Sequence, residues 1–211
     1  MVDFKGLTGK KKREYIWEYY KIHIIVGIIS VILLGSFIHS KFTEIHYEFN
    51  LTVIGSSVKS DKTEEFQNKL TSVVLKNPSK NQSAEFDNIP IQNIIGSNDG
   101  NAYQYMQKIM AEASANVLDA IILSKPDYDN FVKNGLFLNL EKTNLDLDKY
   151  KDISVKGETK DGEKGTFAIS IENSKVLKEY GMDTRDKVIC IVGSSKQKDK
   201  AVSTLKWILG S

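Results

Sequence analysis

The sequence predicts an α/β domain that follows a single N-terminal transmembrane helix, and three observations lead to this. Residues 22–38 contain no Asp, Glu, Lys or Arg, and no other segment resembles them. Beyond residue 43, segments of period two alternate with segments of helical period, which is typical of strands followed by helices. The run 117–123 is almost continuously apolar, as in strands that helices cover on both faces. We therefore expect a mainly parallel sheet with flanking helices and right-handed crossovers.

The apolar segment is expected to form a transmembrane helix over residues 22–40. The uncharged residues 22–38 would span about 25 Å at a rise of about 1.5 Å per residue, the short end of what crosses a bilayer. Tyr and Trp side chains precede the segment, and Lys21 and Lys41 bracket it, as expected at the two water interfaces. A buried helix of a soluble protein is the alternative, but it does not explain these flanks.

Residues 1–21 form a basic tail, with six Lys or Arg against three Asp or Glu. Positive charge resists translocation, so we expect this tail in the cytoplasm and residues 43–211 outside the cell, as the extracytoplasmic domain of a single-pass protein of the cell membrane. A cleavable signal peptide is the competing interpretation. Residues 36–40 lack a small-x-small cleavage site, which favours an uncleaved signal-anchor.

Composition narrows the class of protein further. Cys190 is the only cysteine, so no internal disulfide forms, and no lipid-anchor cysteine follows the apolar segment. Within the apolar run 188–192, Cys190 is expected to pack in a core rather than to react. The exported part suffices for one domain or two small lobes. Abundant Lys and Asn suit a low-GC Gram-positive bacterium. The excess positive charge lies in the tail, so no nucleic-acid partner is expected.

The expected elements follow in chain order. Alternating apolar and polar side chains over 44–53 predict the first strand, which Gly55 closes. The remaining elements are a helix over 61–76, a strand over 84–94, a helix over 101–115, the strand 117–123, a short helix from Pro126 to Gly135, a hairpin turn at Asp161-Gly162, strands over 166–171 and 187–192, and a helix over 198–209.

Three segments resemble the extracellular solute-binding proteins of ABC importers. Residues 117–140 look like their strand, short helix and exit from the first lobe, residues 165–181 like the return strand and helix, and residues 191–207 like the last strand, turn and closing helix. The resemblance covers most of 44–211 and implies a type 2 periplasmic-binding-like fold that binds a solute. This chain is shorter, and its second lobe is reduced to little more than a hairpin. Residues 15–23 are similar to anchors of uncharacterised Gram-positive membrane proteins.

Loops at the carboxyl ends of strands are the candidate ligand-binding positions, because open α/β sheets bind ligands there. Small residues let a ligand approach the backbone, and a helix N-terminus supplies N–H donors for an anion. The candidate residues are Ser56, Ser57, Ser97, Asn98, Ser124 and Lys125. The loop 193–195 is a fourth position of this kind. Each loop can also be read simply as a turn or cap that needs Gly and Ser.

Catalytic motifs are missing from the sequence: there is no Gly-x-Ser-x-Gly, His-Glu-x-x-His, Gly-x-x-x-x-Gly-Lys or Cys-x-x-Cys. Glu44, His46 and Glu48 share a strand face at a spacing that can ligate a metal, but a solvated strand face explains them, so we expect no metal or other cofactor. We expect a membrane-anchored, non-enzymatic binding or sensing domain. The alternative is an accessory subunit that binds another protein. The expected partners are the lipid bilayer, a small-molecule ligand, and a membrane protein such as a transporter.

Overall fold

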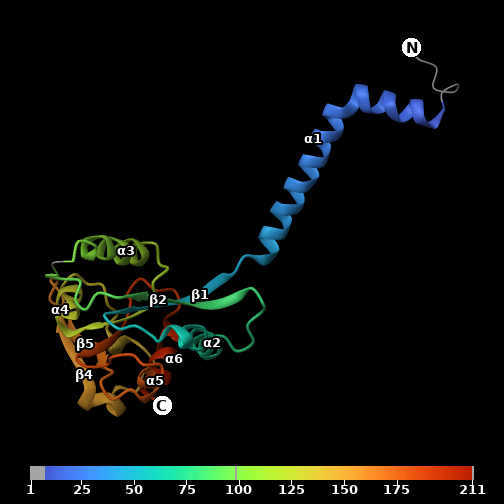
Figure 1. Ribbon diagram of the computed structural model, residues 1–211. Helices are drawn as coiled ribbons and strands as arrows, with labels where there is room; N and C mark the ends of the chain where they lie inside the picture. The colour runs from blue at the N-terminus through green and yellow to red at the C-terminus, as the bar shows by residue number, and fades with distance from the viewer. Residues whose placement is uncertain (1–7, 98, 211) are drawn as a thin grey trace. The chain divides into compact units, whose positions relative to one another are not determined.

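The computed structural model describes residues 8–97 and 99–210. The chain divides between Glu44 and Ile45 into two compact units. The first contains the long helix α1, and the second, which we call the α/β domain, contains the six strands found in the described part of the chain (Figure 1).

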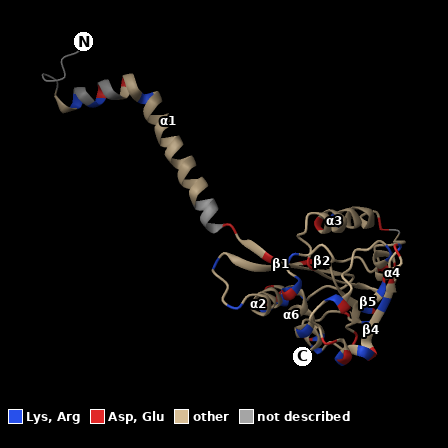
Figure 2. Cartoon of the chain, turned by 180° about the vertical axis from the view of Figure 1, so that it is seen from behind, with Lys and Arg blue, Asp and Glu red and all other residues tan. Residues whose placement is uncertain are grey.

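Helix α1 runs from Gly9 to Thr43. Its segment Trp17–Ile38 is long and apolar enough to cross a membrane, by length and composition, and none of it is buried against other described residues. Among the residues of this helix that Figure 2 colours by charge, the charged ones lie in its N-terminal part, ahead of the long uncharged stretch. The helix continues through Thr43, so only Glu44 and Ile45 separate it from the first strand. Residues 1–7 of the expected cytoplasmic tail lie outside the described residues.

The α/β domain is built on one six-stranded sheet. Its strands are β1 (His46–Ile54), β2 (Gln82–Ile89), β3 (Ala120–Ser124), β4 (Ser154–Glu158), β5 (Lys164–Ser170) and β6 (Lys187–Ile191), in the order β2-β1-β3-β6-β5-β4. β1 is parallel to β2 and β3, whereas β3–β6, β6–β5 and β5–β4 are antiparallel. The α/β class is confirmed, but the sheet is mixed, so the prediction of a mainly parallel sheet is wrong.

The direction of β6 was not readable from its side chains. All five residues of β6 are buried, and the four after Lys187 are apolar, as in a strand covered on both faces whichever way it runs. Between β5 and β6 lies only the five-residue helix α5 (Lys175–Glu179), and β6 returns antiparallel beside β5. The expected hairpin at Asp161-Gly162 joins β4 to β5. Both strands belong to this same sheet, with β4 outermost, so the hairpin does not form a separate lobe.

Helices cover both faces of the sheet (Figure 1). On one face, α2 (Thr63–Val74), α5 and α6 (Lys198–Leu209) pack over Phe49, Leu51 and Ile189. On the other face, α3 (Ala102–Ser114) and α4 (Lys125–Lys133) pack over Ile121, Val188 and Cys190. The prediction that helices cover both sides of β3 is therefore confirmed, and each face has its own apolar core.

Most expected elements are present within a few residues of their predicted limits, and β2 departs furthest. It ends at Ile89 rather than near residue 94, because Pro90 follows and cannot donate a ladder hydrogen bond. Ile91, which had suggested a longer strand, is buried in the loop after β2, and so is Ile94. This loop lies at the edge of the sheet where the candidate site forms.

Candidate functional site

The strands of the sheet begin and end along two opposite edges, and the carboxyl ends of two parallel strands lie together at one of them. Ile54 ends β1 and Ser124 ends β3, and the strands are parallel neighbours. β6 runs in the opposite direction, so its first residue, Lys187, lies at this same edge and is the register partner of Ser124. The loops after β1 and β3 and the loop before β6 are thereby brought together.

Two adjoining hollows open at this edge. The larger, which we call the lysine hollow, has a volume of about 550 Å³ and is lined by Gln92, Asn93, Ser124, Lys125, Pro126, Asp183, Arg185, Asp186 and Lys187. The smaller, which we call the serine hollow, has a volume of about 170 Å³ and is lined by Gly55, Ser56, Ser57, Pro90, Gln92, Gly181 and Asp183. Gln92 and Asp183 line both, and we call the two hollows together the strand-end site.

Four residues predicted from the sequence line the strand-end site. Ser56 and Ser57 follow β1 and line the serine hollow, while Ser124 and Lys125 lie where β3 passes into α4 and line the lysine hollow. Ser57 and Lys125 are exposed, whereas Ser56 and Ser124 are buried. The side chains of Ser57 and Lys125 can therefore contact a ligand that enters from solvent. Those of Ser56 and Ser124 also hold the loops together.

The two buried serines bind the loops to each other through their hydroxyl oxygens. Ser56 Oγ accepts a hydrogen bond from the backbone N–H of Asp183 at 2.7 Å, which ties the loop after β1 to the loop before β6. Ser124 Oγ accepts from the backbone N–H of Asp127 at 3.4 Å and caps the N-terminus of α4. In both contacts the oxygen is the acceptor, so each hydroxyl retains its proton for a ligand oxygen.

The loop before α3 contributes differently from what the sequence predicted. Ser97 lines neither hollow, and its Oγ accepts a hydrogen bond from the backbone N–H of Asp99 at 3.0 Å, which shapes the turn into α3. Asn98 lies outside the described residues. The start of this loop is fixed instead by the buried Asp127, whose carboxylate accepts hydrogen bonds from the backbone N–H groups of Ile94 and Ile95.

The loop 193–195 lies at the opposite edge of the sheet, because β6 is antiparallel to β3. The expectation that it joins the other strand-end loops is therefore wrong. Ser194 Oγ donates to the carbonyl oxygen of Ala113 at 2.7 Å, and Ser195 Oγ donates to the carboxylate of Asp119 at 2.5 Å. Both serines stabilise the packing of loops at that edge.

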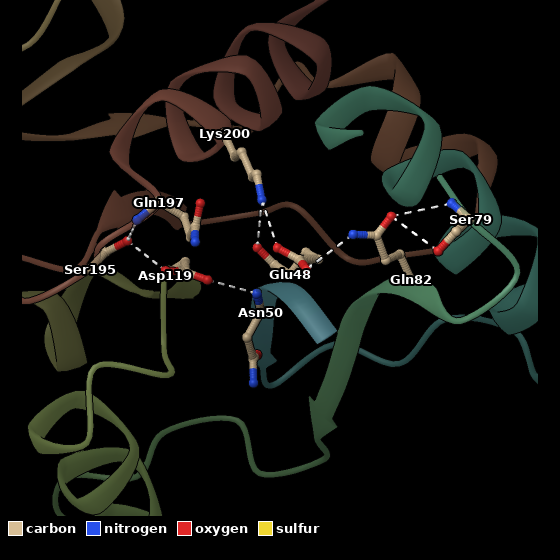
Figure 3. Close-up of polar contacts among 8 residues, drawn as sticks. All are labelled: Glu48, Asn50, Ser79, Gln82, Asp119, Ser195, Gln197 and Lys200. Carbon is tan, nitrogen blue, oxygen red and sulfur yellow. Dashed lines mark hydrogen bonds and ion pairs between the residues drawn. The ribbon is translucent and has the colours of Figure 1, made fainter. Parts of the chain in front are cut away.

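Figure 3 shows the polar network of this opposite edge. Asp119 is buried and also accepts the backbone N–H of Asn50 at 2.9 Å, which joins β1, β3 and the start of α6. Burial raises the pKa of Asp119, and its hydrogen bonds to Ser195 and Asn50 oppose the rise. Nearby, Lys200 forms a 3.4 Å ion pair with Glu48, which also accepts from Gln82. Glu48 is thus committed to protein contacts.

Glycine is required at position 55, where β1 ends. Gly55 has a φ of +68°, and a Cβ atom there would lie 2.7 Å from the carbonyl oxygen of Gln92 and 2.9 Å from Lys187 Nζ. The missing side chain lets the Gln92 backbone and the Lys187 ammonium close around the end of the strand. The absence of a side chain at position 55 therefore shapes the boundary between the two hollows.

Lys187 is the buried cation of the strand-end site. It is 3% exposed, and its Nζ donates a hydrogen bond to the carbonyl oxygen of Ile54 at 2.8 Å. Burial lowers the pKa of Lys187, because the charged form loses water, while the negative charges of Asp183 and Asp127 oppose the shift. The ammonium is therefore held in an environment that favours the approach of a further negative charge.

Asp183 and Arg185 form a local ion pair at the rim of the lysine hollow. Arg185 donates to both carboxylate oxygens of Asp183, at 2.8 and 3.0 Å, and these contacts lower the pKa of Asp183 to about 2. The pair is exposed on its guanidinium side. The lining of the lysine hollow contains three cations and two carboxylates, so it carries a formal charge of +1.

Sequence reasoning missed Gln92, Asp183, Arg185 and Lys187. Gln92 was placed inside a strand that ends earlier. The other three precede or begin β6, and the rule applied to the sequence considers only residues that follow strands. The one available signal was Lys187 itself, a lone charge at the head of the apolar run 188–192.

The strand-end site offers hydroxyl, amide, ammonium and carboxylate groups within two small hollows. These are the groups that orient small polar ligands in proteins. Within the described part of the chain there is no group of three or more His, Cys, Asp or Glu side chains that could hold a metal ion. Comparison with models of protein families, with curated proteins and with solved structures finds no match. The function is therefore argued from the geometry of this site.

Proposed function

We propose that this chain is a membrane-anchored binding or sensing domain that holds a small polar solute in the strand-end site, outside the cytoplasm. The observation that carries the proposal is the meeting of Ser56, Ser57, Ser124 and Lys125 around two adjoining hollows at the carboxyl ends of β1 and β3. Ligands of open α/β sheets bind at such edges. The sequence resemblance to solute-binding proteins of ABC importers supports the same function.

The proposed location in the membrane is inferred from helix α1. Its apolar stretch fits a bilayer in length, and the basic tail before it favours a cytoplasmic N-terminus with the α/β domain on the outer side. Protease added to intact cells without a wall should remove the α/β domain. Protection of the domain until the membrane is dissolved would contradict this topology.

Ligand binding is tested by melting the fragment 43–211 with sugars, amino acids, short peptides and oxyanions. This fragment contains both apolar cores of the α/β domain. A solute present at about 100 times its dissociation constant stabilises the folded state by about 2.7 kcal/mol, which gives a clear shift in melting temperature. We expect at least one class of solute to produce this shift.

A matched pair of variants locates the binding. Ser57→Trp places an indole in the serine hollow at an exposed position and should abolish the shift. Ser72→Trp places the same side chain on the exposed face of α2 and should leave the shift intact. A shift of equal size in both variants would mean that the solute binds elsewhere, and the absence of any shift would contradict the proposed function.

An accessory subunit that binds another protein is the second candidate. It is favoured by large apolar side chains exposed on the α/β domain: Tyr103 and Met110 on α3 and Val117 after it are 69%, 42% and 51% exposed. Exposed apolar groups of this kind mark contact surfaces when they lie together. Tyr103→Ser with Val117→Ser should release a partner that co-purifies with the wild-type chain from native membranes. Retention of that partner by the double variant would remove this surface as its binding site.

A further inference from the structure

Lys187 is a buried cation with most of its hydrogen-bonding capacity unused. An ammonium has three N–H donors. One of them serves the Ile54 carbonyl oxygen, and across residues 8–97 and 99–210 we find neither a second acceptor nor an ion-pair partner for Nζ. A buried charge is unfavourable unless it is paired. Lys187 lines the lysine hollow, which is the space from which a partner can reach it.

The nearest protein carboxylates are occupied by other groups. Both oxygens of Asp127 accept backbone N–H groups, from Ile94 and Ile95. Asp183 is bound by Arg185 through both of its oxygens. These two carboxylates act on Lys187 only through space, and they leave its free N–H groups without an acceptor. The third, Asp186, also lines the hollow, and its charge is included in the net +1 of the lining.

A second, separate feature favours an anion in the same hollow. Helix α4 has nine residues, and Ser124, Lys125 and Pro126 at its N-terminus line the lysine hollow. The N-terminus of a helix carries a partial positive charge that favours anions. In α4 the N–H of Lys125 already donates to the carbonyl oxygen of Asp186, and the N–H of Asp127 donates to Ser124 Oγ. Pro126 has no N–H, so the helix contributes this charge rather than free donors. A buried ammonium on one strand and a helix N-terminus after another therefore border one cavity.

We infer that the lysine hollow binds the oxyanion of a small acidic solute, a carboxylate or a phosphate group, through the ammonium of Lys187. This inference rests on the proposed function and names the class of ligand. The acidic group would accept the unused N–H groups of Lys187, and exposed Lys125 would add a second positive charge at the mouth of the hollow. The rest of the solute would extend toward Gln92 and the serine hollow, which adjoins at that residue.

The test uses the full chain in micelles of an uncharged detergent, titrated in a calorimeter at constant ionic strength. The probes are inorganic phosphate, succinate and glucose, so phosphate, carboxylate and neutral chemistry are compared directly. We expect one of the two anions to bind with a stoichiometry of one. Lys187→Met should raise its dissociation constant roughly tenfold or more, because a charge-assisted hydrogen bond is lost. Lys164→Met removes an exposed cation at the opposite edge and should change nothing.

Two further measurements keep the test independent of a folding defect. Circular dichroism and melting of Lys187→Met show whether the variant folds, and an apolar chain of similar length suits this buried position. Lys125→Met removes an exposed charge of the same hollow without risk to the core. It should weaken binding about two- to fivefold, as expected for an exposed ion pair.

Three results would overturn the inference. Equal anion affinity in the wild type, Lys187→Met and Lys125→Met would show that the hollow does not hold the acidic group. Binding of glucose but of neither anion would also overturn it, while the proposed function would remain supported. Absence of binding by these probes, together with no melting shift in the wider screen, would remove both the inference and the proposed function.

Discussion

The ammonium of Lys187 lies 2.8 Å from the carbonyl oxygen of Ile54, although β3 separates the two strands to which these residues belong. The first residue of β6 is thus bound to the last residue of β1 across the neighbouring strand. Gly55 makes this contact possible, because any Cβ at that position would meet the ammonium. One hydrogen bond thereby joins the loops that form both hollows.

The stability that depends on Lys187 should vary with pH. Burial lowers the pKa of Lys187 from its ordinary value of 10.5. At a pH below 10.5, the Lys187 side chain is therefore protonated in a smaller fraction of folded molecules than of unfolded molecules. Stability then rises with pH until the unfolded lysine also loses its proton. We expect the free energy of unfolding of the wild type, relative to Lys187→Met, to increase as the pH rises toward 10.5. Urea unfolding of both proteins measures this difference, and a decrease as the pH rises would contradict the burial of the charge.

Gly55→Ala should destabilise the α/β domain by about 2–4 kcal/mol, because a left-handed backbone and close contacts act together. Gly96 has a similar φ of +76°, but a Cβ atom there would meet no other atom within 4 Å. Gly96→Ala should therefore carry the backbone strain alone, about 1–2 kcal/mol. Chemical denaturation of the two variants separates these effects. Equal losses would show that Gln92 and Lys187 do not crowd position 55.

Asp119→Ala should lower the free energy of unfolding by about 2–4 kcal/mol, because the buried N–H of Asn50 and the hydroxyl of Ser195 lose their acceptor. Asp129 lies exposed on α4, and Asp129→Ala should change stability by less than about 0.5 kcal/mol. Denaturation curves of both variants provide the comparison. A loss no larger than that of the exposed variant would mean that water replaces the carboxylate at this edge.

Cys190 should remain unreactive in the folded protein. It is fully buried in β6, and burial raises the pKa of its thiol, so little thiolate forms. A thiol reagent should modify it only in denaturant. Cys190→Ala should cost roughly 1–2 kcal/mol through a small cavity, and Cys190→Asp much more. Unchanged stability of Cys190→Asp would mean that residues 188–192 do not form a core strand.

The sequence predicted the elements well, because burial on one or two faces leaves a local pattern. The period of two in β1 and the apolar run of β3 are examples. Strand direction leaves no such pattern, so the antiparallel course of β6 was missed, and the loop 193–195 was assigned to the wrong edge. β1 also differs from expectation: both faces of the sheet are covered, so its polar Asn50 and Thr52 are buried as well.

The candidate site was predicted only in part, because the rule applied to the sequence finds residues that follow strands and no others. Ser56, Ser57, Ser124 and Lys125 follow parallel strands, where a general rule places ligands, and they do line the two hollows. Lys187 is the first residue of a strand, and its ammonium is bound by the carbonyl oxygen of Ile54, which lies 133 residues earlier in the chain. A contact between such distant residues has no local signature, so only the folded chain reveals the cation.

The central claim is that a small polar solute binds in the strand-end site, and mapping amide chemical shifts tests it most directly. The isotopically labelled fragment 43–211 is titrated with the probe that gives the largest melting shift. We expect the largest changes at Ser57, Gln92, Lys125 and Asp183, which line the two hollows. Asp119 and Ser195 at the opposite edge should not respond. Changes centred on that opposite edge or on α3, with the hollows unaffected, would contradict the account.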